Sequence, residues 1–343
     1  MKSGSKAPSM RDGKSHRMED VAVEAKVSLA TVSRVFSQPD LVSEETRQRV
    51  HEAAARLRYL PNLMAGSMAG KRSRIVGALV PAIASPIFSE TISGLSSVLR
   101  EARYELMLSQ SGYDPEQELS ILQAFLGRRV DAIVVAGAVI TPPSRELLLN
   151  AGTPVVETWE LITEPIDMAV GFSNPDAAAA SARFLIDRGY RRLGFIGGTD
   201  RRSMQRLEGF SAALRKAGLA DPQAISIKSP APSSFMEGGA AMDRMLRQDQ
   251  KVDAVFCTND LLAAGALFEC QRRGLAVPGD IAVMGFSNLD ISEVTVPALT
   301  TVQVGAREIG SQAAQMILDR IEGQGARPLP LDTGFSIIER QST

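Results

Sequence analysis

The stretch Asp20-Val-Ala-Val-Glu-Ala-Lys-Val-Ser-Leu-Ala-Thr-Val-Ser-Arg34 decides the fold of the first part of the chain. The spacing of its apolar residues predicts two short helices, over Met18–Ala25 and Leu29–Ser37, with a tight turn at residues 26–28 between them. A helix, a short turn and a second amphipathic helix have the shape that fits the major groove of B-DNA. The stretch therefore predicts a helix-turn-helix headpiece.

The second predicted helix has one face available for DNA. Val32 and Phe36 are expected to face the first helix, which leaves the other side at the surface. There Arg34 can donate two hydrogen bonds to a guanine edge, apolar side chains can contact a thymine methyl group, and hydroxyl groups suit phosphate oxygens. The predicted DNA-binding residues of this region are Ser28, Leu29, Ala30, Thr31, Ser33 and Arg34. The alternative is a plain three-helix bundle with no role on DNA.

A third helix completes the predicted headpiece. Ser43 is a suitable N-cap with Glu44 and Glu45 in the first turn, and the helix is expected to end near Leu57. We predict a disordered basic tail over residues 1–15, a headpiece over 16–62 and a hinge or linker over 63–74.

Charge is distributed unevenly along the 343 residues. Residues 1–74 hold 14 Lys and Arg against 8 Asp and Glu, a local charge of +6, although the whole chain carries −1. The rest of the chain is therefore acidic. A basic end on an acidic body suits a nucleic-acid-binding headpiece whose body is kept away from phosphate.

From Ile75 onward, short apolar runs alternate with helical segments, which indicates βαβ units and parallel sheets. The predicted strands are Ile75–Val80, Glu105–Leu108, Ala132–Val135, Pro154–Val156, Leu193–Ile196, Ala254–Cys257 and Ile281–Met284. So many units favour two lobes with a ligand between them. We expect one lobe over 75–172 and 303–326, and a second over 173–302 and 327–343. The predicted fold class is α/β, with a three-helix headpiece and a two-lobed core.

The sequence also argues against enzyme activity, a metal site and a membrane span. Both histidines, His16 and His51, lie in the headpiece, so the core has no histidine for nucleophilic catalysis or metal binding. The glycines around Gly197 lack the spacing of a nucleotide-binding loop, and Cys257 and Cys270 are expected to be buried thiols. We expect no enzyme activity, no cofactor, no metal and no membrane span, and a cytoplasmic location because the amino terminus lacks an export signal.

Several segments together resemble the lactose-repressor (LacI/GalR) family of bacterial regulators. They are the headpiece stretch, Tyr59-Leu60-Pro61-Asn62, Ser85-Pro86-Ile87-Phe88, Thr258-Asn259-Asp260, Val296-Pro297-Ala298-Leu299-Thr300-Thr301 and Glu339-Arg340-Gln341-Ser342-Thr343. The resemblance implies a periplasmic-binding-protein-like core and a homodimer that binds a near-palindromic double-stranded operator. A periplasmic sugar-binding protein shares such a core but would need an export signal and no headpiece.

In this family a hinge helix orders on DNA and inserts an apolar side chain into the minor groove, a role that the resemblance gives to Met68. Three residues depart from the family pattern: Arg17 replaces the usual Ser or Thr cap, Lys26 the usual turn Gly, and Gly66 the usual hinge Arg. Because glycine disfavours helix by about 1 kcal/mol, we expect a hinge that orders less readily.

The resemblance also implies an effector site. Ser287 stands where neutral-sugar pockets commonly have Asp, and Ser173 where many relatives have Asp, so an anionic effector is expected. Arg206 matches the family's ligand-binding Arg, and Arg201 and Arg202 lie on the same loop. The predicted effector-binding residues are Ile87, Phe88, Ser173, Arg206, Asn259 and Ser287.

The choice of effector rests on likeness within the family. The segments Val255–Pro278 and 167–174 are most similar to regulators of gluconate genes, which implies gluconate, a ketogluconate or a similar sugar acid. A neutral sugar effector, or a sugar-binding module without a regulatory role, are the alternatives. Phe88 is as well suited to the core as to a ligand, and Trp159 is suited to the core or to a lid.

Overall fold

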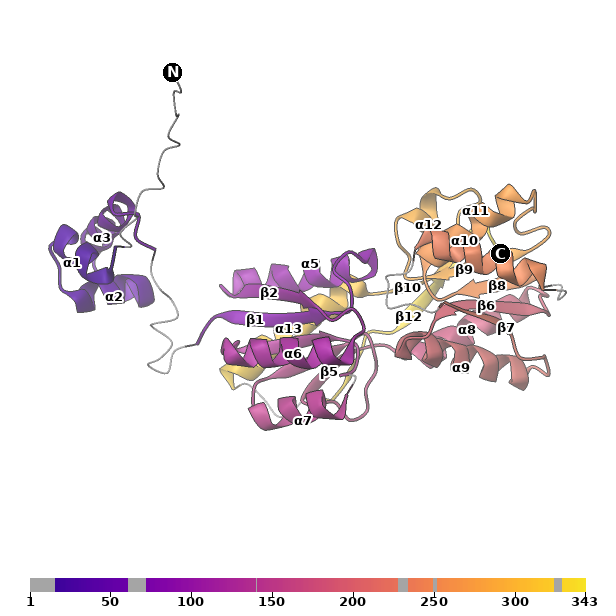
Figure 1. Cartoon of the computed structure of the whole chain (residues 1–343), viewed down its shortest axis with the longest axis horizontal. Helices are drawn as coiled ribbons and strands as arrows, with labels where there is room; N and C mark the ends of the chain where they lie inside the picture. The colour runs from indigo at the N-terminus through magenta and orange to yellow at the C-terminus, as the bar shows by residue number, and fades with distance from the viewer. Residues whose placement is uncertain (1–15, 61–71, 140, 228–233, 249–251, 324–328) are drawn as a thin grey trace, which may run out of the picture. The chain divides into compact units, whose positions relative to one another are not determined.

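The computed structural model describes residues 16–60, 72–139, 141–227, 234–248, 252–323 and 329–343 (Figure 1). The chain divides into two compact units, residues 1–73 and 74–343. The expected tail over 1–15, and Gly66 and Met68 of the expected hinge, lie outside the described residues.

The first unit contains the three expected helices, α1 (Met18–Ala25), α2 (Leu29–Ser37) and α3 (Glu44–Arg56), with a short 3-10 turn at Pro39–Leu41. Their buried side chains form one small core, to which each helix contributes: Val21, Ala22, Ala25, Val32, Val35, Val50, Ala53 and Ala54. The helix-turn-helix prediction is therefore confirmed.

One packing detail of α2 differs from the prediction. Val32 and Val35 are the buried residues of this helix, whereas Phe36 is only half-buried. The Phe36 ring lies edge-on to His51 of α3, with ring centroids 5.5 Å apart. Phe36 therefore packs beside the third helix, because positions 32 and 35 already cover the apolar face toward the core.

Two family departures have visible structural consequences. Lys26 has a φ of 54°, in the left-handed region that favours glycine, which explains why this turn position suits Gly. Arg17 precedes α1, and its backbone N–H donates to Asp20 Oδ2 at 2.8 Å. Asp20 therefore supplies a hydrogen bond at a helix start whose residue 17 has no acceptor side chain.

The second unit contains two six-stranded sheets (Figure 1). The first has the order β11-β5-β4-β3-β1-β2 and is parallel throughout. Its strands are β1 (Ile75–Val80), β2 (Glu105–Gln110), β3 (Ala132–Ala136), β4 (Val155–Thr158), β5 (Met168–Gly171) and β11 (Leu331–Asp332). Its helices are α5 (Pro86–Glu101), α6 (Pro115–Gly127), α7 (Pro142–Ala151) and α13 (Ala306–Glu322).

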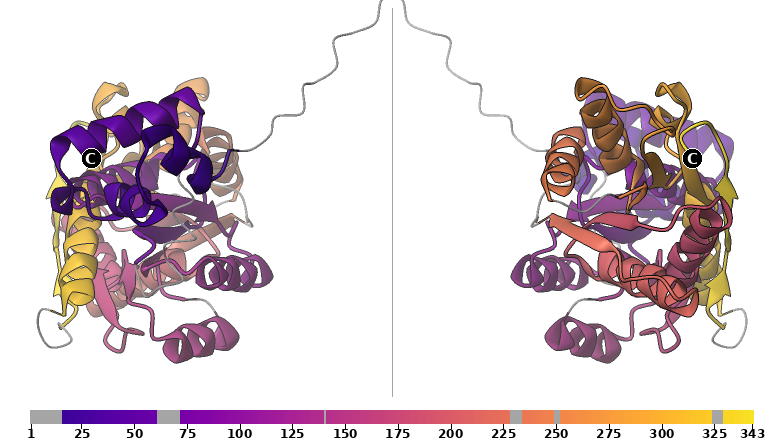
Figure 2. Two further views of the ribbon diagram at one scale, coloured as in Figure 1. Left: turned by 90° about the vertical axis from the view of Figure 1, so that its left-hand side faces the viewer. Right: turned by 90° about the vertical axis from the view of Figure 1, so that its right-hand side faces the viewer.

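The second sheet has the order β12-β10-β9-β8-β6-β7. Its strands are β6 (Leu193–Gly198), β7 (Gln223–Ile227), β8 (Ala254–Cys257), β9 (Ala282–Phe286), β10 (Thr300–Val304) and β12 (Phe335–Ile338), of which β12 is antiparallel to β10. Helix α8 (Asn174–Asp187) precedes β6, and the helices that follow strands of this sheet are α9 (Arg201–Lys216), α10 (Phe235–Arg247), α11 (Asp260–Arg272) and α12 (Ile291–Val294). Figure 2 shows the strands of the core lying between helices.

The chain crosses between the sheets near its end. After β10 in the second sheet, α13 packs against α5 of the first lobe, where a Cβ added to Gly94 would lie only 2.2 Å from the Arg307 carbonyl oxygen. Glycine therefore allows the two helices to approach closely. We expected residues 327–343 to lie in the second lobe; β12 does, but β11 pairs with β5 of the first sheet.

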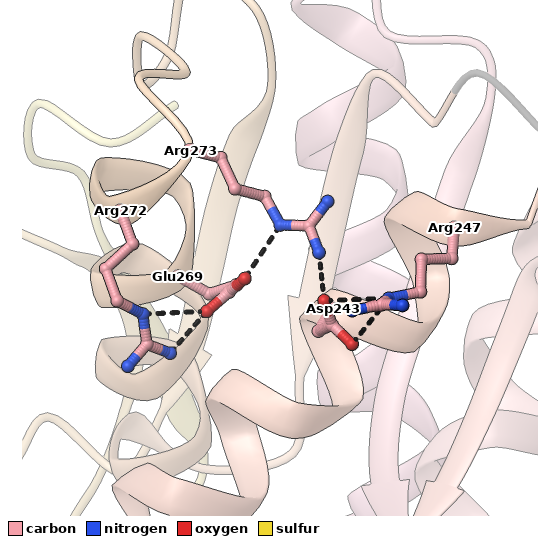
Figure 3. A network of polar contacts seen from close by, with 5 residues as sticks. All are labelled: Asp243, Arg247, Glu269, Arg272 and Arg273. Carbon is pink, nitrogen blue, oxygen red and sulfur yellow. Dashed lines mark hydrogen bonds and ion pairs between the residues drawn. The ribbon is translucent and has the colours of Figure 1, made fainter.

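Helices α10 and α11 are joined at the surface by a charged network (Figure 3). Arg273 bridges Asp243 of α10 and Glu269 of α11, while Arg247 and Arg272 each pair with the acidic residue of their own helix. Exposed pairs of this kind contribute little stability because water screens them. Among the described residues, no helix is long and apolar enough to span a membrane.

Candidate functional site

The outward face of α2 presents the side chains predicted to contact DNA. Ser28, Leu29, Ala30, Ser33 and Arg34 are exposed and Thr31 is half-buried. Leu29 has 44 % of its surface exposed, although it is a large apolar residue. The Arg34 guanidinium has no side-chain or backbone partner among the described residues, so its donors are available to a base edge.

Two of these residues, Ser28 and Thr31, also stabilise the amino end of α2. Ser28 is the N-cap of α2, and its Oγ accepts a hydrogen bond from the Thr31 backbone N–H at 3.1 Å. The Ser28 and Thr31 hydroxyl oxygens lie 2.8 Å apart and share a hydrogen bond. These side chains therefore stabilise the amino end of α2, where positive backbone N–H groups also suit a phosphate.

In the second unit, a small cavity of about 50 Å³ lies between the two lobes. Five predicted effector-binding residues line it: Ile87, Phe88, Arg206, Asn259 and Ser287. Ser173 does not line this cavity; it caps α8, and its Oγ accepts a hydrogen bond from the Asp176 N–H at 3.2 Å. Asn259 likewise caps α11 through Leu262.

A larger cavity of about 460 Å³ adjoins the small one, and Tyr113, Asp200 and Arg202 line both. Its walls come from segments that follow the carboxyl ends of β1, β2, β3, β4 and β6, which include Pro81, Ser111, Gly137, Glu160 and Thr199. The wall thus combines the carboxyl ends of parallel strands from both sheets, which is where α/β proteins bind ligands.

Arg206 is the most strongly held charged residue of this region. Only 7 % of its surface is exposed, its Nε donates to Asn174 Oδ1 at 2.9 Å, and its Nη1 donates to the Thr258 carbonyl at 2.6 Å. The guanidinium carbon lies 3.6 Å from the centroid of the Phe286 ring. Burial, followed by the nearby charge of Arg202, lowers the pKa of Arg206 to about 9.

Asn174 connects this arginine to the first lobe. Its Nδ2 donates to the Trp159 carbonyl at 3.0 Å, while its Oδ1 accepts from Arg206. Trp159 itself is buried, and its Nε1 donates to Thr91 Oγ1 at 3.1 Å. Its ring lies edge-on to Phe88 at 5.5 Å. Trp159 and Phe88 thus belong to the core, and both also form part of the wall of the small cavity.

Two further arginines begin α9. Arg201 pairs with Glu160, with 3.0 Å between Nε and Oε2. Arg202 lies over the Phe88 ring, 5.1 Å from its centroid, and its Nη2 lies 3.4 Å from the Tyr113 hydroxyl. Burial acts to raise the pKa of Asp200, but the charge of Arg202 and hydrogen bonds from Ser203 outweigh it, so that pKa is lowered.

The residue-level predictions missed Tyr113, Glu160 and Asp200 as cavity-lining groups. Each follows a strand of the parallel sheets within a few residues: β2, β4 and β6. The rule that ligands bind beyond the carboxyl ends of strands was thus a signal that could have found them.

Comparison with known proteins defines the class. Residues 17–62 match Bacterial regulatory proteins, lacI family, and residues 182–343 match Periplasmic binding protein-like domain. HTH-type transcriptional regulator GntR from Pseudomonas aeruginosa is 37 % identical over 95 % of both chains. GntR from Escherichia coli is 35 % identical over 93 % of this chain and 96 % of that protein.

Solved structures agree across the whole fold. A Lacl family transcriptional regulator from Silicibacter pomeroyi has a TM-score of 0.88 and 30 % identity, covering 95 % of this chain and 99 % of that one. The lac repressor dimer bound to operator and the anti-inducer ONPF has a TM-score of 0.82 and 25 % identity, covering 96 % and 99 %. The protein is a DNA-binding transcriptional regulator. It belongs to the lacI family of bacterial regulatory proteins, which confirms the resemblance.

Proposed function

We propose that this regulator is a repressor of sugar-acid metabolism genes that leaves its operator when it binds gluconate or a closely related aldonate. It acts in the cytoplasm as a homodimer on a near-palindromic site, with residues 28–34 and Met68 contacting DNA. The likeness to gluconate regulators, and the similarity to two proteins named GntR, support this proposal.

The observation that carries the choice of effector is the chemistry of the cleft. Ser287 lines the small cavity where a carboxylate would be expected for a neutral sugar, and Arg202 and Arg206 line the same cavity. A bound carboxylate there meets the guanidinium groups of Arg202 and Arg206, which attract it, and the one carboxylate of the same wall, Asp200, accepts hydrogen bonds from Ser203. Glu160 lies in the larger cavity, but Arg201 pairs with it.

The mechanism is a shift between two arrangements of the lobes. Lining residues come from both: Phe88 begins the helix after β1, whereas Arg206 and Asn259 belong to elements of the second sheet. An effector that contacts both lobes favours one arrangement over the other. A coupling free energy of about 1–3 kcal/mol would weaken operator binding about 5- to 150-fold.

The test is operator affinity, measured by fluorescence anisotropy on the promoter DNA of the regulator's own gene at fixed salt. Gluconate is expected to release the DNA, and glucose at equal concentration is not. Release by glucose alone would favour a neutral sugar, and tight DNA binding indifferent to both would discard the sugar-acid effector. A scrambled DNA duplex serves as the control for binding that does not depend on sequence.

A further inference from the structure

Arg202 stands at the junction of the two cavities. It is the second residue of α9 and lines both the 50 Å³ and the 460 Å³ cavity, as do Tyr113 and Asp200. Its Nη1 is buried and has no hydrogen-bond partner among the described residues. A buried guanidinium nitrogen without an acceptor is costly, so this position favours a ligand that brings one.

The surroundings hold the guanidinium in place without neutralising it. Its carbon lies 5.1 Å from the centroid of Phe88 and 6.0 Å from that of Trp159, and both rings are buried. The nearest carboxylate in sequence, Asp200, caps α9: its Oδ1 accepts from the Ser203 N–H and its Oδ2 from the Ser203 hydroxyl. Arg202 thus forms no ion pair within 4.0 Å among the described residues.

The amino end of α9 adds to this positive field. Arg201 and Arg202 occupy its first two positions, and no acidic residue lies in its first turn. The amino end of a helix is partially positive, so cations there are disfavoured and anions are favoured. Arg201 is compensated by Glu160. Arg202 departs from this preference and forms no ion pair among the described residues, and such departures are typical of functional positions.

Arg206 is less suited to this task. Its Nε and Nη1 already donate to Asn174 and Thr258, and Phe286 covers one face of its guanidinium. These contacts tie α9 to the start of α8 and to the end of β8. Arg206 is therefore a positioning residue that fixes the helix from which Arg202 extends.

The larger cavity suits the remainder of a sugar acid. Its volume of about 460 Å³ lies within the range of small-molecule sites. Ser111, Tyr113 and Glu160 line it with hydroxyl and carboxylate groups, and Glu160 is 4 % exposed. Groups of this kind hydrogen-bond to ligand hydroxyls, whereas a short carboxylate such as acetate would leave the cavity unused.

We propose that Arg202 binds the carboxylate of the effector at the junction of the two cavities, and that the larger cavity receives its hydroxylated chain. This inference rests on the proposed function, since it assigns the anion recognition of that same site. Arg202 thereby determines the preference for a sugar acid over a neutral polyol of equal length.

The experiment measures binding of gluconate and of sorbitol to the full chain by titration calorimetry. The wild-type protein is expected to prefer gluconate. Arg202→Gln is expected to weaken gluconate binding about 10- to 100-fold, the size of a lost charge-assisted contact, with little effect on sorbitol. Arg202→Lys keeps the charge but loses the planar fork, so it should fall between the two.

Arg215→Gln is the matched control, because it removes a charge from the last turn of α9, where Arg215 pairs with Asp221. It is expected to keep the wild-type preference. Unchanged gluconate affinity in a folded Arg202→Gln protein would overturn the role of Arg202. If Arg202→Gln fails to fold, wild-type gluconate affinity in Arg202→Lys overturns it instead. Wild-type protein that binds no gluconate at all overturns the proposed effector itself.

Discussion

The outward face of α2 and the cleft between the two sheets hold their functional side chains in different ways. On α2, Arg34 is exposed and has no partner among the described residues. In the cleft, Arg206 is 7 % exposed and is bonded to Asn174 and Thr258. A surface that meets DNA leaves its donors to water until a base replaces it, whereas the buried donors of a small-molecule site are bonded to the protein unless the ligand itself supplies the acceptor.

The two regions also differ in how much core supports them. In the described part of the chain, the headpiece depends on a core of eight buried side chains from three short helices, while the effector core is built on two six-stranded sheets. Small units bury a smaller share of their surface and are correspondingly marginal. A change in the headpiece is therefore expected to remove DNA binding without removing effector binding, and the following changes test that separation.

The largest effect is expected from Val32→Asp. Val32 is fully buried in the headpiece, so the change places an unpaired charge in the small core and unfolds it. Specific operator binding should fall more than about 100-fold, while gluconate binding to the core stays unchanged in calorimetry. Val23→Asp is the control, because Val23 is 78 % exposed, and the headpiece should keep its helical circular dichroism.

The next effect is expected from Arg34→Ala, which removes the exposed fork from α2. A bidentate contact to a guanine is worth about 1–3 kcal/mol, so specific operator affinity should fall about 5- to 150-fold in anisotropy titrations. Arg34→Lys keeps the positive charge and should retain binding to scrambled DNA while losing much of the specificity. Equal operator affinity in all three proteins would place the base contacts elsewhere.

In the cleft, Asn174→Ala tests whether the Arg206 network supports the fold. The change leaves the buried Arg206 Nε and the Trp159 carbonyl without partners, so the free energy of unfolding of the core should fall by about 1.5–3 kcal/mol in urea titrations. Ser173→Ala, which removes the cap of the same helix, should cost about 0.5–2 kcal/mol. A loss for Asn174→Ala no larger than for Ser173→Ala would contradict the network.

The smallest expected effect is a pH dependence in the free energy of unfolding of the core. Burial raises the pKa of Asp260 to about 7, although Thr301 and Leu289 donate to its carboxylate. A pKa raised in the folded state means that this residue's contribution to stability is present below about pH 4 and is lost as pH rises through about 7. Asp260→Asn should flatten the fall in stability between pH 5 and pH 8. Parallel pH profiles for the two proteins would show that Asp260 is already ionised at pH 5.

The headpiece was predicted almost completely from the sequence. α1 and α2 begin and end where the periodicity of Met18–Ser37 places them, because the contacts that form them are local. The seven predicted strands of the core are present as well. The edge and late strands, such as β7, β10 and β11, were not predicted. Their pairing depends on distant segments, and β11 has only two residues, Leu331 and Asp332.

The cleft was predicted only in part. Motif positions named five residues that line the small cavity, and Ser173 was named with them although its side chain caps a helix. Sequence spacing cannot report whether a polar side chain is free or already bonded, because its partners come from other elements. Thr258 lies 52 positions from Arg206, yet its carbonyl occupies Nη1.

The sequence by itself determined that this protein has a helix-turn-helix headpiece, an α/β core and an Arg-rich segment after the strand β6, since these depend on local periodicity and composition. Only the tertiary structure decided which arginine is free. Arg201, Arg202 and Arg206 are alike in the sequence, but folding pairs the first with Glu160 and bonds the third to Asn174 and Thr258. Arg202 is left with a buried nitrogen at the junction of two cavities, because hydrogen-bond partners are assigned by contacts between distant segments.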